Sequence, residues 1–227
     1  MVGGTVMSGS KDEILNRVRN ALQDVPDDES TEADIDRKYR KEGDMSAGDL
    51  LKLFAENVGD YRATVKVVKI TELQNAIRES CEDEKVRKLV IPPGLEASWI
   101  KWDDGEIEFI QDSPEPLSHA ALDESDAVLT GCFIAAAQTG TIVLNGGPGQ
   151  GRRALTLLPD LHICIVKSEQ ISGIVPEIFS ALDSQIKELG PPITLISGPS
   201  ATSDIELSRV EGVHGPRRLH VIIVDQT

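Results

Sequence analysis

Cysteine is scarce in this sequence, and its three cysteines stand far apart, at Cys81, Cys132 and Cys164. They form no Cys-x-x-Cys pair, and no histidine stands at the distance from them that zinc or iron-sulfur sites use. We therefore expect no metal site and no intrinsic cofactor. The cysteines are interpreted as buried or incidental thiols.

Long apolar runs are also missing. The longest, such as Val221–Val224 and Ile193–Ile196, are far shorter than the roughly 20 residues of a membrane span. The segment Met1–Gly9 has neither the basic start nor the apolar stretch of a secretory signal. We expect no membrane span and a cytoplasmic location.

Basic residues are outnumbered, because 23 lysines and arginines face 38 aspartates and glutamates, giving a net charge of -15. This balance excludes broad binding of nucleic acid, which needs clustered positive charge. The adjacent arginine pairs are Arg152-Arg153 and Arg217-Arg218, each beside a glycine or proline. Local capture of a small anion remains compatible with the sequence.

The chain of 227 residues is long enough for one α/β domain with a real core. Residues 1–45 are expected to hold a helix beginning at Ser10, with Ile14, Leu15 and Val18 on one face, and then an acidic mobile segment. Residues 46–227 are expected to form the α/β domain. This arrangement leaves open whether the first helix packs on the domain, on a second copy or on another protein.

Helical and strand patterns alternate along the rest of the chain, which is typical of βαβ units and a mostly parallel sheet flanked by helices. Helices are expected from Ser46 to Asn57, from Thr71 onward, and from Ile174 to Leu189. The expected strands are 63–70, 88–91, 107–110, 127–130, 141–144, 163–166, 193–196 and 219–224.

Glycines and hydroxyl residues mark a first candidate site. The motif Gln138-Thr139-Gly140-Thr141 is followed by a glycine-rich loop and two arginines, and the candidate ligand-binding residues are Thr139, Gly140, Thr141, Gly147, Gly149, Gln150, Arg152 and Arg153. Successive amides in such a loop can form a nest for a carboxylate or phosphate. Because arginines replace the Lys and Ser/Thr of a Walker A motif, a nucleotide hydrolase is not expected. The alternative is a plain glycine-rich turn between two elements.

A second candidate follows the strand at 193–196, where Ser200 and Thr202 are candidate ligand-binding residues and Asp204 and Glu206 candidate catalytic carboxylates. The alternative is that Asp204 caps a short helix. A third candidate is His214, in a glycine- and proline-flanked turn where its imidazole could move protons. His162 and His220 fall within strand patterns and are weaker candidates.

Taken together, these segments resemble the lactate-utilisation protein C family, also known by its LUD domain. The resemblance spans about residues 10–225 and rests on four motifs: Gln138–Thr141, the Gly146–Arg153 loop with Leu157-Leu158-Pro159-Asp160, Ser200–Glu206 and Gly212–Pro216. It implies the fold of sugar-phosphate isomerases and CoA transferases. It also implies membership of a three-protein system that oxidises L-lactate to pyruvate, in which the other two components carry iron-sulfur clusters.

The resemblance leaves the task of this component open. The first reading is a non-redox accessory or regulatory subunit with a pocket for a small carboxylate or phosphate-bearing ligand, and it is compatible with a homo-oligomer. The second is a stand-alone enzyme of the CoA-transferase or sugar-phosphate-isomerase type that uses Glu206 or Asp204. The third is a ligand sensor without chemistry. Gln138 departs from the family, which commonly has an acidic residue before Thr-Gly-Thr, so a nucleophile at that position would be lost.

Overall fold

The computed structural model describes residues 10–24, 38–102, 105–188, 190–203, 209–212 and 214–226, without the side chains of 202, 203 and 209–211. The chain divides into two units, Met1–Tyr39 and Arg40–Thr227. In the first unit the predicted helix is present as α1 (Ser10–Ala21), and none of its residues is buried. Residues 25–37 of the predicted acidic segment lie outside the described residues.

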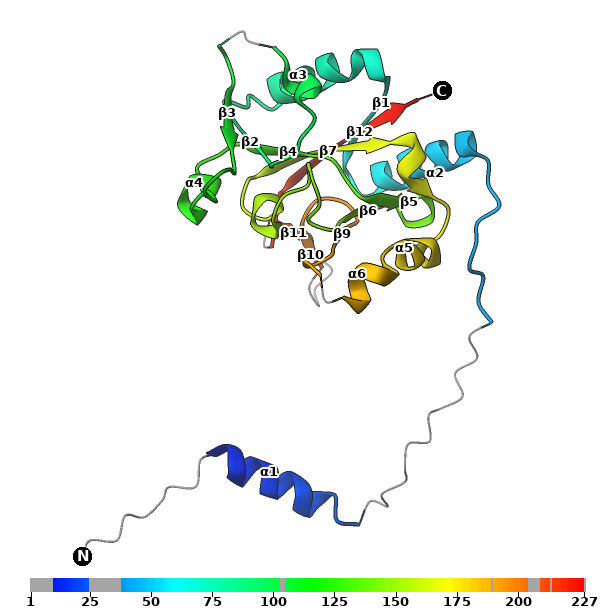
Figure 1. Cartoon of the computed structure of the whole chain (residues 1–227), viewed down its shortest axis with the longest axis vertical. Helices are drawn as coiled ribbons and strands as arrows, with labels where there is room; N and C mark the ends of the chain where they lie inside the picture. Colours follow the sequence, from blue (N-terminus) through cyan, green and yellow to red (C-terminus); the bar gives the residue numbers. More distant parts are fainter. Residues whose placement is uncertain are drawn as a thin grey trace, which may run out of the picture. The chain divides into compact units, whose positions relative to one another are not determined.

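A six-stranded sheet forms the centre of the second unit (Figure 1). Every pair of neighbouring strands in it is parallel, which confirms the predicted mostly parallel sheet. Its strands, in spatial order, are β1 (Thr64–Lys69), β12 (Arg218–Asp225), β7 (Leu161–Lys167), β4 (Ala127–Thr130), β2 (Lys88–Ile91) and β3 (Glu108–Gln111). Strands β12, β7 and β4 are buried along nearly their whole length, as strands covered on both faces are.

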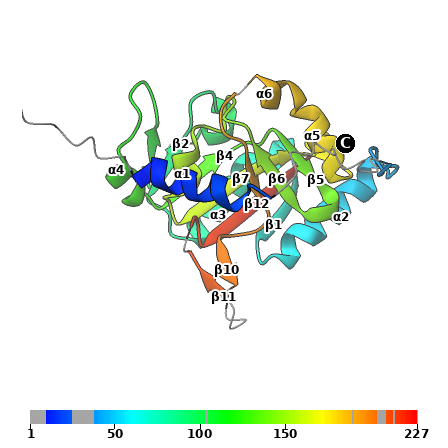
Figure 2. The ribbon, with the colours of Figure 1, turned by 90° about the horizontal axis from the view of Figure 1, so that it is seen from below.

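A second sheet has four strands: β8 (Ile171–Ser172), β5 (Ile134–Ala136), β6 (Thr141–Leu144) and β9 (Thr194–Ile196). Strand β6 pairs antiparallel with both β5 and β9. The apolar runs at 141–144 and 193–196 are therefore strands, as predicted, but they lie outside the parallel sheet. A two-stranded hairpin, β10 (Ala201–Ser203) with β11 (Arg209–Glu211), projects from the sheets (Figure 2).

Helices cover both faces of the main sheet. Helix α3 (Leu73–Asp83) packs on one face through Leu73, Ile77 and Cys81. The second sheet and α2 (Ala47–Asp60), which contributes Phe54 and Val58, pack on the other face. Helix α2 begins as predicted, with the Ser46 hydroxyl accepting the Asp49 N–H at 3.3 Å. A short helix, α4 (His119–Asp123), packs near β2 and β4.

The predicted helix from 174 to 189 is instead two short helices, α5 (Val175–Ala181) and α6 (Asp183–Lys187), interrupted at Leu182. The Ser180 hydroxyl donates to the Pro176 carbonyl at 3.1 Å, a bond within the helix that favours bending. Leu182 and Ile178 are buried against β5 and β6. The chain therefore bends where its apolar residues meet the outer face of the second sheet.

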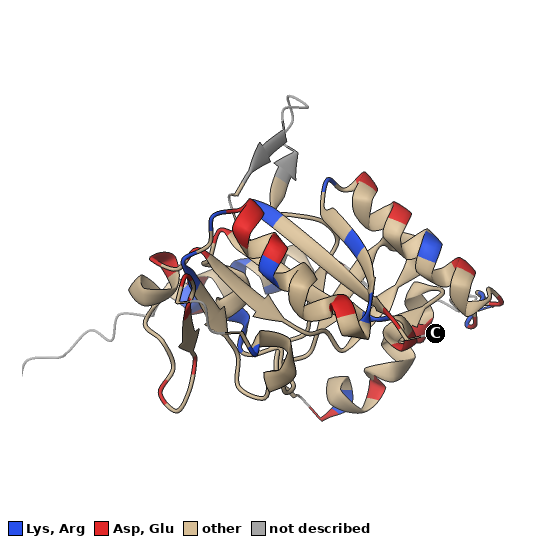
Figure 3. Ribbon diagram, turned by 90° about the horizontal axis from the view of Figure 1, so that it is seen from above, with Lys and Arg blue, Asp and Glu red and all other residues tan. Residues whose placement is uncertain are grey.

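Acidic and basic positions are interspersed along the helices of the ribbon in Figure 3. Among the described residues, no helix combines the length and apolar character that crossing a membrane requires.

Candidate functional site

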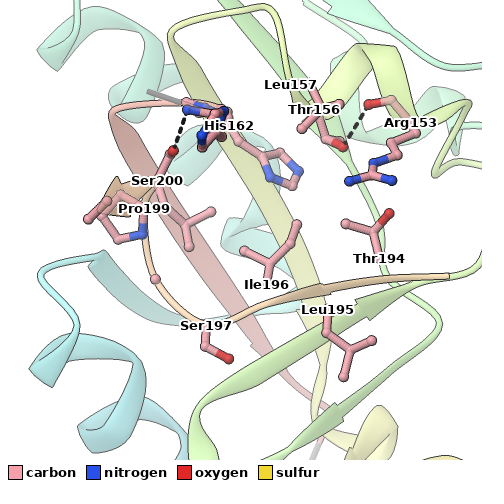
Figure 4. A pocket seen from close by; sticks show the side chains of 16 residues that line it. Arg153, Thr156, Leu157, His162, Thr194, Leu195, Ile196, Ser197, Pro199 and Ser200 are labelled. Carbon is pink, nitrogen blue, oxygen red and sulfur yellow. Dashed lines mark hydrogen bonds between the residues drawn. The ribbon is translucent and has the colours of Figure 1, made fainter. Parts of the chain in front are cut away.

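A cavity of about 310 Å³ is the centre of the candidate site (Figure 4). Three elements build it: the 3-10 turn η4 (Arg153–Thr156), the segment running from β9 to β10, and the turn before β12. The lining residues are Arg153, Thr156, Leu157, His162, Thr194, Leu195, Ile196, Ser197, Gly198, Pro199, Ser200, Ala201, His214, Gly215, Pro216 and Leu219.

The cavity lies at the amino ends of β7 and β12. His162 and Leu219 are each the second residue of their strands, and they are partners in the sheet register. The segment after β9 follows a strand end, as predicted, but β9 runs in the second sheet. The expectation of a site at the carboxyl ends of parallel strands therefore does not describe this cavity.

The two neighbouring arginines have different environments. Both Nε and an Nη atom of Arg152 donate to the buried Asp112 carboxylate, at 2.9 and 3.0 Å, and Arg152 also donates to the Leu117 carbonyl at 2.6 Å. Arg153 is exposed, and its guanidinium has no protein partner among the described residues. It borders the cavity and two adjoining hollows of about 730 and 300 Å³. Arg153 is thus the arginine placed to bind an anion.

Two histidines line the cavity. His162 is almost fully buried, and its Nε2 lies 2.8 Å from the Thr130 hydroxyl. The predicted His214 is exposed, and its backbone N–H donates to the Ser200 hydroxyl at 3.2 Å. From the sequence alone His162 is a weak candidate, and the signal that points to it is a polar residue in an otherwise apolar strand.

A chain of hydroxyl groups joins the Gln138–Thr141 motif to the cavity. Thr139 Oγ1 lies 2.7 Å from Thr141 Oγ1, which in turn lies 2.8 Å from Ser197 Oγ. Ser197 lines the cavity, whereas Thr141 lies on β6 and Thr139 ends the 3-10 turn η3 (Ala137–Thr139) before that strand. Gln138 is exposed.

Gly140 fixes the position of this motif against α2. Its φ is +56°, and a Cβ atom on it would lie 2.8 Å from the carbonyl carbon of Asn57 and 2.8 Å from the nitrogen of Val58. The Asn57 side chain also donates to the Ala137 carbonyl at 2.7 Å. The glycine therefore serves both the left-handed turn and the close approach of two backbones.

We expect the substitution Gly140→Ala to lower the free energy of unfolding by roughly 2–4 kcal/mol, because strain and overlap add. Urea unfolding followed by circular dichroism measures the change. Gly48→Ala is the matched control, because Gly48 lies in α2 and a Cβ there would meet nothing within 4 Å. Equal stability of the Gly140→Ala variant and the wild type would contradict this assignment.

The glycine-rich loop lies elsewhere and is already paired with protein groups. The N–H of Gly149 donates to the Pro93 carbonyl at 2.9 Å, and its carbonyl accepts from Gly131 at 2.8 Å. The N–H of Gly147 donates to Asn145 Oδ1, and that of Gln150 to the Gly147 carbonyl. These bonds attach the loop to the carboxyl ends of β2 and β4. These contacts are those of a glycine-rich turn between two elements, which was the alternative interpretation of the loop. They give no support to the predicted amide nest.

The second arginine pair is neutralised by carboxylates. Arg217 and Arg218 both bind Asp160, and Arg218 also binds Glu84. Burial raises the pKa of Asp160, but hydrogen bonds from Arg217 and the two arginine charges lower it below its usual value. This pair therefore stabilises the start of β12.

The predicted carboxylates Asp204 and Glu206 lie outside the described residues, and the side chain of Thr202 is not described. The structure thus brings together Arg153, Ser200 and His214 of the predicted residues. Among the described residues, no group of three or more His, Cys, Asp or Glu side chains could hold a metal ion.

Comparison with known proteins matches residues 51–224 to the model of the LUD domain family. A protein named lactate utilization protein C from Deinococcus radiodurans is 47% identical over 180 residues, covering 79% of this chain and 82% of that protein. One of the same name from Halalkalibacterium halodurans is 27% identical over 195 residues, covering 79% and 81%. The crystal structure of a DUF162 family protein from D. radiodurans superposes with a TM-score of 0.68 at 40% identity, covering 80% of this chain and 99% of that one.

Proposed function

Since this chain belongs to the LUD domain family, we propose that it acts in lactate utilisation as an accessory component that binds a small carboxylate. The names of the similar proteins support the pathway. The accessory role is supported by the cysteine spacing, which matches no iron-sulfur motif. Oxidation of lactate to pyruvate releases two electrons, so the proposal places their carriers in iron-sulfur partner proteins.

Arg153 is the observation on which the proposed carboxylate site rests. In a protein with a net charge of -15, most of the surface repels an anion, and a binding site needs a local cation. A guanidinium matches a carboxylate with two parallel hydrogen bonds. Arg152, Arg217 and Arg218 already bind carboxylates of the protein, whereas Arg153 faces the cavity.

The other lining groups suit a short 2-hydroxy or 2-oxo acid. The volume of about 310 Å³ is at the small end of ligand pockets. His162, His214, Ser197 and Ser200 offer donors and acceptors for the oxygen on the second carbon, and Leu157, Ile196 and Leu219 provide apolar contact. The cavity therefore combines one cation with several neutral polar groups.

Isothermal titration of the full chain with L-lactate and with pyruvate tests the proposal, with inorganic phosphate titrated in parallel. We expect saturable binding of one carboxylate per chain that weakens as salt is raised, because the attraction is electrostatic. Binding of phosphate without binding of either carboxylate would refute the carboxylate site, and so would the absence of heat with all three.

A further inference from the structure

One side chain of the candidate site reaches from the cavity into the core. His162 lines the cavity, where Figure 4 shows its ring, although the residue is almost fully buried. Its Nε2 atom lies 2.8 Å from the hydroxyl oxygen of Thr130, which is fully buried and does not line the cavity. Because Nε2 is engaged in the core, Nδ1 is the ring nitrogen left for a ligand.

The sheet register brings these two residues together. His162 is the second residue of β7 and lies opposite Val128 of β4, whereas Thr130 lies opposite Cys164. Residues two apart in a strand point to the same face, so the side chains of Thr130 and His162 share one face of the sheet. The pair is therefore held by two buried strands, and its geometry is set by their backbone hydrogen bonds.

The direction of the hydrogen bond follows from the burial of Thr130. Its hydroxyl proton needs an acceptor, and Nε2 of His162 is the only nitrogen or oxygen atom hydrogen-bonded to this hydroxyl among the described residues. The nearby Cys164 thiol donates to the Gly131 carbonyl at 3.7 Å, and its sulfur is a weak acceptor. If Nε2 carried a proton, the buried hydroxyl proton would be left unpaired at a cost of about 1–3 kcal/mol. The hydroxyl therefore donates to an unprotonated Nε2.

From this geometry we infer that Thr130 is a positioning residue, which holds His162 as the tautomer with its proton on Nδ1 and so presents a hydrogen-bond donor to the ligand. The inference rests on the proposed carboxylate site and names the class of its ligand. Arg153 and His162 are then both donors, and a 2-oxo acid offers only acceptors, on its carboxylate and on its second carbon. The hydroxyl group of a 2-hydroxy acid brings a proton that needs an acceptor of its own.

The site therefore favours a 2-oxo acid such as pyruvate over L-lactate. Within the proposed pathway pyruvate is the product of the oxidation, so the component binds the product more tightly than the substrate. One net hydrogen bond contributes about 0.5–1.5 kcal/mol, which corresponds to a difference in affinity of about 2- to 10-fold.

The tautomer is measured on the ligand-free full chain by ¹⁵N NMR at about pH 8, where histidine rings are generally neutral. The chain has four histidines, and the signal missing from a His162→Gln variant identifies the ring. We expect the proton on Nδ1 in the wild type and in Thr130→Ser, and a mixture of tautomers in Thr130→Val. Ser80→Ala is the matched control, because it removes another buried hydroxyl, on α3, and should leave the His162 signal unchanged.

Isothermal titration of the same proteins with pyruvate and with L-lactate measures the ligand preference. We expect the wild type to bind pyruvate about 2- to 10-fold more tightly than L-lactate. Thr130→Val should lose this preference, whereas Thr130→Ser and Ser80→Ala should keep it.

A proton on Nε2 in the wild type would overturn the role of Thr130, and L-lactate bound as tightly as pyruvate, or more tightly, would overturn the ligand class. If neither acid binds, the proposed function and the ligand class both fail, while the NMR signal still decides the role of Thr130. The wild-type tautomer and the Thr130→Ser variant decide that role even if Thr130→Val does not fold.

Discussion

Replacing Arg153 with glutamine is expected to weaken the binding of L-lactate or pyruvate by about 10- to 150-fold. The substitution keeps a polar side chain but removes the charge, and a hydrogen bond to a charged group contributes about 1.5–3 kcal/mol. Because Arg153 is exposed and has no protein partner among the described residues, the unfolding free energy should change by less than about 0.5 kcal/mol. Isothermal titration and thermal unfolding measure the two effects separately.

The control for this experiment is Arg17→Gln. Arg17 lies on α1 in the other unit and is exposed, with an ion pair to Glu13 at 2.7 Å. The Arg17→Gln substitution removes the same charge from the chain as Arg153→Gln does. If both variants bound the carboxylate equally weakly, the effect would be a general electrostatic one. Unchanged affinity in the Arg153→Gln variant would remove the residue on which the proposed site rests.

Replacing the neighbouring Arg152 with methionine is expected to act on stability. We expect it to lower the free energy of unfolding by roughly 2–4 kcal/mol. Arg152 makes a bidentate pair with Asp112, whose side chain is only 4% exposed, so the variant leaves a buried carboxylate unpaired. Urea unfolding at pH 7 measures the loss. The double variant with Asp112→Asn should recover part of it, because no buried charge then remains.

The stability gap between wild type and Arg152→Met should also depend on pH. Burial raises the pKa of Asp112, but the hydrogen bonds from Arg152 and the Leu117 N–H and the charge of Arg152 lower it below 3.8. A carboxyl whose folded-state pKa is lowered stabilises the protein above its unfolded pKa and loses that contribution as the pH falls. The difference in unfolding free energy between the wild type and the variant should therefore be largest near pH 7 and become smaller below about pH 4. A gap that does not change with pH would contradict the assigned ion pair.

The sequence predicted most elements of the fold because their signals are local. The strands at 88–91 and 127–130 have the predicted bounds, and Ser46 caps its helix as expected. Which sheet a strand joins is not a local property. The apolar runs at 141–144 and 193–196 resemble buried parallel strands, but long-range packing places them in the second sheet, where they pair with each other in antiparallel orientation.

The sequence predicted which segments form the candidate site, but it did not predict which residue in each segment lines the cavity. Arg152 and Arg153 are equivalent in the sequence, and only the fold brings Asp112 to the first and a cavity to the second. The glycine-rich loop remains a predicted anion site, and three of its amides, those of Gly147, Gly149 and Gln150, donate to oxygens of the protein.

Purification of the tagged protein from lactate-grown cells tests the accessory role most directly, with the partners identified by mass spectrometry and lactate-dependent electron transfer measured on the isolated complex. We predict that iron-sulfur proteins copurify, that the complex reduces an electron acceptor with L-lactate, and that activity falls when this chain is removed. A protein that purifies alone, or a complex whose activity does not depend on this chain, would contradict the account.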